Sequence, residues 1–108
     1  MESLIKLIAT FHRKSGMSDE EFLRYWKEVH VPLVARLPNL VGYVINPLVE
    51  TMDDTRPYDG MAELWFASRE RFEAAMASPE RDAARADLEK FTDLASMTRA
   101  IVDEERIL

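Results

Sequence analysis

Cysteine is absent from the 108 residues of this chain, which excludes a disulfide framework and a thiolate nucleophile. No apolar run approaches the roughly 20 residues that a membrane-spanning helix requires. Glycine-rich phosphate loops and the Gly-x-Ser-x-Gly elbow are also missing, which argues against nucleotide-binding folds and the commonest serine hydrolases. Because two histidines and scattered acidic residues match no metal-binding spacing, we expect neither a metal nor another cofactor.

Basic residues are outnumbered, with 14 Lys and Arg against 20 Asp and Glu, and the formal net charge is −6. The positive charges are interleaved with the acidic ones and form no stripe. We therefore expect no nucleic acid partner and no membrane partner. The N-terminus has no basic segment followed by a long apolar stretch, which predicts a cytoplasmic protein without a signal peptide.

The chain nevertheless has the material for one hydrophobic core, since 47% of its residues are hydrophobic. Its length is typical of a single domain, and no linker or repeat divides it. We predict one domain over residues 1–108.

Four segments have the composition of β-strands: residues 4–11, 40–45, 61–66 and 97–102. Between the first two, Ser18 and Glu21 form a capping box, and apolar residues at helical spacing run to Leu37, before Pro38. Ser68 and Ser78 are further helix N-caps after the third strand. The order is β-α-β-β-α-β, which predicts a ferredoxin-like α+β sandwich.

Both helices of this topology cover one face of the sheet. Alternation assigns one set of strand residues to the helix side: Ile5, Leu7, Phe11, Val44, Leu64, Phe66, Ala100 and Val102. The opposite face then carries a second apolar set: Ile8, Tyr43, Ile45, Met61, Trp65 and Ile101. Because a large apolar surface usually marks an interface, this face predicts a homodimer in which the sheets of the two protomers pack against each other.

The same outer face carries four polar residues, which suit an enclosed small-molecule pocket better than a dry interface: Lys6, Thr10, Glu63 and Arg99. A β-bulge would invert the assignment of faces. The irregular acidic segment 50–59 is either a lid over such a pocket or a passive connection.

Two residues are candidates for chemistry. His30, at the end of the first helix, is either a general acid or base or an imidazole that caps the helix and packs against Trp26. Tyr43 is either a hydrogen-bond donor to a developing oxyanion or a core or interface tyrosine.

Further residues are expected to contact a substrate: Trp65, Met61, Glu63, Ile8 and Trp26. Of these, Glu63 is a possible base if its pKa is raised, and otherwise pairs with Lys6 or Arg99 across the sheet.

Much of the chain resembles the EthD family, which is named for a protein of ethyl tert-butyl ether degradation. The resemblance lies in residues 14–18, 21–22, 25–26, 30–33, 37–38, 42–43, 58–66 and 72–79. It implies a dimeric α+β barrel with a pocket in each protomer. The related methylmuconolactone methylisomerases use a histidine at the end of the first helix and a tyrosine in the second strand, at a spacing similar to that of His30 and Tyr43. Haem-degrading relatives carry a histidine in the second helical region, whereas residues 79–91 here contain none.

The resulting hypothesis is a cofactor-independent catabolic enzyme that acts on a small hydrophobic organic molecule by proton transfer, like an isomerase or cyclase. Two alternatives stay open at this point. One is a non-catalytic accessory or carrier protein of an oxygenase system, and the other is a cofactor-free monooxygenase or other oxidoreductase.

Overall fold

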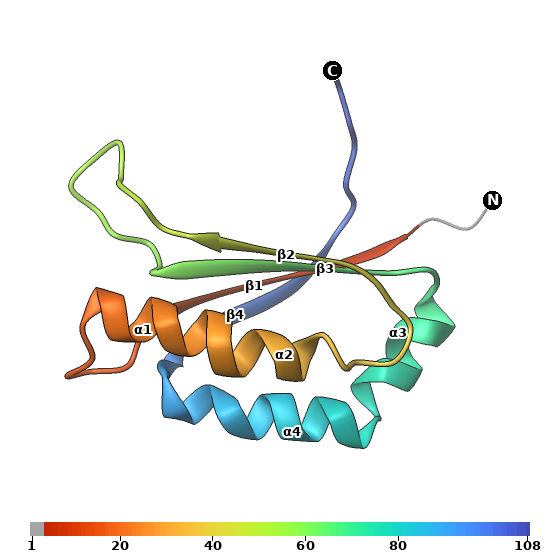
Figure 1. The fold of residues 1–108 in the computed structure, drawn as a ribbon. Helices are drawn as coiled ribbons and strands as arrows, with labels where there is room; N and C mark the ends of the chain where they lie inside the picture. The colour runs from red at the N-terminus through yellow and green to blue at the C-terminus, as the bar shows by residue number, and fades with distance from the viewer. Residues whose placement is uncertain (1–3) are drawn as a thin grey trace.

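A computed structural model describes residues 4–108; Met1, Glu2 and Ser3, part of the N-terminal segment considered above, lie outside the described residues. Four antiparallel strands form one sheet in the order β2-β3-β1-β4, and the helices lie on one of its faces (Figure 1). The strands are β1 (Ile5–Arg13), β2 (Leu40–Pro47), β3 (Gly60–Phe66) and β4 (Thr92–Val102). The helical segments are α1 (Asp19–Tyr25), a π-helical turn (Trp26–His30), α2 (Val31–Val34), α3 (Arg69–Met76), α4 (Pro79–Asp87) and a 3-10 turn (Leu88–Lys90). The predicted ferredoxin-like α+β fold is confirmed.

Three serines begin the helices as predicted. The Ser18 hydroxyl accepts a hydrogen bond from the backbone N–H of residue 21 at 3.1 Å. Ser68 and Ser78 each accept one from the N–H three residues further on, at 3.2 Å in both cases. Each hydroxyl thus satisfies one of the first-turn amides that have no partner within the helix.

The first helical region is less regular than its apolar spacing predicts. The N–H of Val31 bonds to the carbonyl of Trp26, five residues back, which makes the turn π-helical. Pro32 explains this widening, because it has no amide donor and its ring would clash with the carbonyl four residues earlier in a regular α-helix. The widened turn ends at His30 and buries both Trp26 and His30. Such turns often accompany functional sites.

A β-bulge in β2 inverts the predicted faces of that strand. Leu40 pairs with Phe66 and Gly42 with Trp65, so Val41 is an extra residue without a partner on β3. Beyond it the alternation is reversed. The outer-face placement of Tyr43 and Ile45 and the helix-side placement of Val44 are therefore wrong, and Tyr43, opposite Leu64, faces the helices.

The predicted faces of β4 are also reversed. Arg99 lies opposite Ala9, and Ile101 lies opposite Leu7, so both face the helix side, whereas Ala100 and Val102 face outward. Because β4 is an edge strand, its helix side is partly open to solvent and tolerates an arginine. The faces of the central strands β1 and β3 agree with the prediction.

An aromatic cluster fills the space between the sheet and the helices. The rings of Phe11 and Trp26 lie 5.1 Å apart and those of Phe22 and Phe91 lie 5.7 Å apart, and Trp26 and Phe91 have no exposed surface.

Within residues 4–108, no helix has the length and apolarity to cross a bilayer.

Gly60 begins β3 directly against this cluster. A Cβ atom at Gly60 would come within 2.5 Å of the Trp26 ring and 3.1 Å of the Phe11 ring. We expect Gly60→Ala to lower the free energy of unfolding by about 1–3 kcal/mol, since overpacking forces buried rings to shift. Urea denaturation measures this, with Gly42→Ala as the control, whose Cβ meets the partly exposed Trp65 ring at 3.0 Å. A loss in the control as large as that in Gly60→Ala would contradict the packing argument.

Candidate functional site

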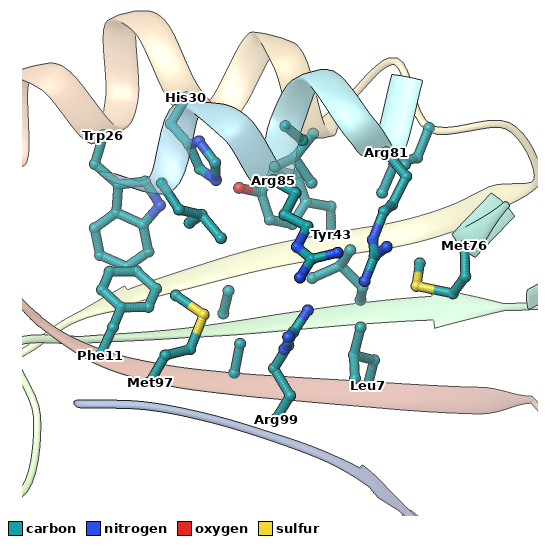
Figure 2. Close-up of a pocket in the computed structure, with 17 residues that line it drawn as sticks. Leu7, Phe11, Trp26, His30, Tyr43, Met76, Arg81, Arg85, Met97 and Arg99 are labelled. Carbon is teal, nitrogen blue, oxygen red and sulfur yellow. The ribbon is translucent and has the colours of Figure 1, made fainter. Parts of the chain in front are cut away.

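A cavity lies between the helix side of the sheet and the helices (Figure 2). Its interior lining is apolar: Leu7, Ala9, Phe11, Trp26, Val34, Leu37, Ala62, Leu64, Met76, Ala84, Leu88 and Met97. Five further lining residues carry polar groups: His30, Tyr43, Arg81, Arg85 and Arg99. A volume of about 100 Å³ is open to the centres of water-sized spheres, whereas one water needs only ~10–15 Å³ on this measure. An apolar hollow with a few polar groups is the usual form of a small-molecule site.

His30 is held in this cavity by a carboxylate. Its side chain is almost fully buried, and its Nδ1 lies 3.0 Å from Oδ2 of Asp87, the last residue of α4. The other carboxylate oxygen accepts a hydrogen bond from the Tyr25 hydroxyl at 2.5 Å. The His30 ring also packs on Phe91, with ring centres 4.8 Å apart. A carboxylate at Nδ1 favours the tautomer that carries its proton there, which leaves the lone pair on Nε2 to accept a proton.

Burial and the carboxylate act on the pKa of His30 in opposite directions. Burial lowers this pKa, and it outweighs the raising effect of Asp87, so the net pKa lies below the ordinary 6.5. The imidazole is therefore neutral at neutral pH and suited to act as a general base. Tyr25 stays protonated, since burial and then the bond to Asp87 raise its pKa to about 12.

Tyr43 reaches the same cavity from β2, because the bulge at Val41 turns it toward the helices. Burial raises the pKa of Tyr43 to about 12, against a smaller lowering effect of the Trp26 side chain. The phenol thus remains a hydrogen-bond donor over the physiological pH range. The cavity therefore brings together an imidazole that can take a proton and a hydroxyl that can stabilise negative charge on oxygen.

The model of the EthD domain family matches residues 14–95 of the chain, well over half of its length. The chain belongs to the EthD family. A protein of Rhodococcus erythropolis is 31% identical over 88 residues, which cover 81% of this chain and 84% of that protein. It is described only as an uncharacterized 11.0 kDa protein in the thcB-thcC intergenic region. The resemblance seen in the sequence is confirmed.

Solved structures share the fold over nearly the whole EthD chain. An EthD family protein of Bacillus halodurans superposes with a TM-score of 0.82 at 24% identity, covering 94% of this chain and 99% of that one. A dimeric ferredoxin-like protein of unknown function from Thermobifida fusca has a TM-score of 0.74 at 18% identity, covering 94% and 92%. SnoaB, a cofactor-independent oxygenase of Streptomyces nogalater, has a TM-score of 0.67 at 15% identity, covering 98% and 97%. At these identities the likeness shows the fold alone.

The residues predicted to contact a substrate fall on two different faces of this EthD fold. Trp26 lines the cavity together with His30 and Tyr43. The other four lie on β1 and β3, on the face of the sheet turned away from the helices, and none lines the cavity: Ile8, Met61, Glu63 and Trp65. The structure therefore separates them from His30 and Tyr43, and their contact with a substrate stays a prediction.

Glu63 forms the ion pair that was one of its two predicted states. Its Oε1 lies 2.7 Å from Nζ of Lys6, and Asn46 donates to Oε2 at 3.0 Å. The hydrogen bond from Lys6 and then that from Asn46 lower the pKa of Glu63. A carboxylate with a lowered pKa is a poor general base at neutral pH, so this state argues against the catalytic alternative.

The irregular segment 50–59 does not cover the cavity in the single chain. It projects from the end of the sheet where β2 ends and β3 begins (Figure 1), and none of its residues lines the cavity. Asp59 fixes the end of this segment, accepting from the N–H of Arg13 at 2.7 Å and from Nε of Arg56 at 2.6 Å. These contacts favour a connecting role over a lid.

Three polar residues of the site are missing from the sequence-based candidates: Asp87, Arg81 and Arg85. A signal for Asp87 exists, because residues 84, 87, 88 and 91 follow the spacing of one helix face, so a carboxylate stands on an otherwise apolar stripe. Arg81 precedes the same stripe by three residues, and Arg99 was assigned to the outer face.

Within residues 4–108, no group of three or more His, Cys, Asp or Glu side chains could hold a metal ion.

Replacing Asp87 with asparagine is expected to lower the pKa of His30 further, because the carboxylate is the group that favours the imidazolium against burial. A pH titration of the His30 ring followed by NMR measures this shift. Asp82→Asn, on the exposed side of α4, is the control and should leave the titration unchanged. An unchanged or raised His30 pKa in Asp87→Asn would show that the pair does not stabilise the cation.

Proposed function

We propose that this EthD protein is a cofactor-independent enzyme that moves a proton on a small organic molecule bound in the cavity. His30 is the general base, and Tyr43 is the hydrogen-bond donor to the oxygen on which charge develops. The Asp87–His30 pair carries the proposal, since it holds a nearly buried imidazole with Nε2 outside every ion pair and side-chain hydrogen bond found within residues 4–108. A purely helix-capping imidazole would need neither the cavity nor the carboxylate.

The chemistry follows from these groups. Nε2 of His30 takes a proton from a carbon next to a carbonyl, the C–H electron pair passes to the carbonyl oxygen, and an enolate forms. Asp87 stabilises the imidazolium, while the Tyr43 hydroxyl donates to the enolate oxygen. Return of the same proton to another carbon of the conjugated system regenerates neutral His30. The overall result is isomerisation. Where the enolate carbon instead attacks a second carbonyl of the same molecule, the electron pair of that carbonyl passes to its oxygen, which takes the proton back from His30, and the result is cyclisation.

A cofactor-independent oxygenase is the second candidate. SnoaB is described as such an enzyme and shares the fold. The first step would again be removal of a proton by His30, because a deprotonated substrate is rich enough in electrons to reduce dioxygen. Dioxygen is the oxidant of this reaction. Oxygen uptake separates the two reactions.

The test does not require the natural substrate to be identified first. The protein is incubated in D₂O with small ketones, lactones and quinols, and proton NMR follows the loss of C–H signal, while an oxygen electrode follows uptake. We expect deuterium exchange or isomerisation of at least one compound faster than in buffer. Compounds that bind without exchange, turnover or oxygen uptake would overturn the enzyme proposal and favour the accessory or carrier protein.

We further propose that the functional unit is a homodimer joined through the outer face of the sheet. This face has no helix over it in Figure 1. Among its residues are Ile8, Val44, Met61 and Trp65. Structural neighbours of this fold are described as dimeric. Light scattering after size exclusion should give twice the 12.5 kDa mass of the chain, and the monomer mass at micromolar concentration would contradict the proposal.

A further inference from the structure

Three guanidinium groups line the same cavity as the candidate base. Arg81 and Arg85 lie on α4 and Arg99 on β4, and their side chains converge on one part of the cavity (Figure 2). No ion pair or hydrogen bond found within residues 4–108 uses any of the three guanidinium groups. The chain has 20 acidic residues against 14 basic ones, so a cluster of unpaired arginines runs against its composition.

The cluster is costly for the empty protein. Burial, followed by the charges of Arg85 and Arg99, lowers the pKa of Arg81 against a smaller raising effect of Asp82, so both other guanidinium groups lie within range to repel that of Arg81. Arg81 is half-buried, whereas Arg85 and Arg99 are exposed, so the cations border the opening of the cavity and not its depth. Bound negative charge would relieve this repulsion.

We infer that the cavity binds a small organic anion with an apolar body, and that Arg81, Arg85 and Arg99 bind its carboxylate at the opening. A guanidinium presents paired N–H donors that match the two oxygens of a carboxylate. The apolar interior takes the carbon skeleton and leads it to His30 and Tyr43. This inference deepens the proposed function and rests on it for the identity of the site, but it is testable by binding alone.

The experiment compares matched probes on the intact protein. Phenylacetate and its neutral amide, phenylacetamide, have the same apolar body and differ in charge; inorganic phosphate serves as a competitor. Calorimetry or ligand-observed NMR should give a dissociation constant for the carboxylate at least about tenfold lower than for the amide, with a preference that weakens as salt is added. Equal affinity for the two probes would overturn the inference. Displacement of phenylacetate by phosphate at equal concentration would overturn the carboxylate assignment and indicate a phosphate ester.

Charge-neutral variants locate the effect. Arg81→Met with Arg99→Met should weaken phenylacetate binding by about 10–100-fold and leave phenylacetamide unchanged. Arg24→Met, which removes an exposed arginine of α1 paired with Glu20, is the control and should bind both probes as the native protein does. Should the double variant fail to fold, the exposed Arg85→Met gives the same comparison. An equal loss in Arg24→Met would contradict the assignment.

Failure of this inference is distinguishable from failure of the proposed function. Carboxylate binding that depends on these arginines, without deuterium exchange on any bound compound, would support the anion site and rule out the role of His30 as a base. Exchange on a neutral ketone by a protein that shows no preference for carboxylates would support the base and rule out the anion site.

Discussion

A His30→Gln variant is expected to lose proton-transfer activity by roughly 10²–10⁴-fold, the usual contribution of a positioned acid or base. Glutamine is of similar size and keeps an N–H donor for Asp87, so the buried carboxylate retains a partner. What it lacks is a lone pair basic enough to take a proton. Substrate affinity should change little, since the apolar lining and the arginines remain.

The second histidine supplies a matched control for this variant. His12 lies on β1, its side chain is partly exposed, and its Nδ1 lies 3.2 Å from Asp59. It does not line the cavity. His12→Gln should therefore retain the native exchange or turnover rate. Native activity in His30→Gln would remove the imidazole from the mechanism, even if the protein binds its substrate.

The native activity should also depend on pH in a defined direction. Because the pKa of His30 is lowered below 6.5, the basic form predominates at neutral pH, and the rate should fall only as the pH drops below that value. Stability should fall in the same range, because the unfolded chain takes up the proton more readily than the folded protein does.

Phe91→Ala is expected to lower the free energy of unfolding by about 3–5 kcal/mol, as for other fully buried phenylalanines. Its ring belongs to the aromatic cluster and also packs on two residues of the site, with ring centres 5.2 Å from Tyr25 and 4.8 Å from His30. That loss is large against the roughly 5–15 kcal/mol stability of a typical domain. Urea denaturation measures it.

Phe72→Ala is the comparison for Phe91. Phe72 is only partly buried on α3 and packs edge-on against Phe66, with ring centres 5.4 Å apart. Its loss should be clearly smaller. If the two variants are equally stable, the fully buried Phe91 ring contributes no more to stability than the partly buried Phe72 ring, which would contradict the prediction.

Local signals were enough to predict the fold. Ser18, Ser68 and Ser78 place the helix starts through one hydroxyl and one amide each, which depends only on residues three apart. The faces of β1 and β3 were also predictable, since central strands alternate under constraint from both sides. The bulge at Val41 was not located, although Gly42 beside it was a signal, since an isolated glycine within a strand often accompanies a bulge.

From the sequence alone, only the site residues of a rare type or with a distinctive side chain could be selected. His30 stands out as one of two histidines, and Trp26 lies four residues before it. Tyr43 was selected as a hydrogen-bond donor but was placed on the wrong face, and its role in chemistry stays a prediction. Asp87 and the three arginines belong to abundant residue types whose role depends on the packing of α4 beside the first helical region and on the register of β4. Those long-range relations require the tertiary structure.

A crystal structure of the protein purified directly from its host would show whether the cavity holds a substrate. We expect a bound small molecule there, with polar atoms within hydrogen-bond distance of His30 Nε2 and the Tyr43 hydroxyl. A cavity closed by repacked apolar side chains, with Nε2 of His30 bonded to a protein group, would contradict this expectation.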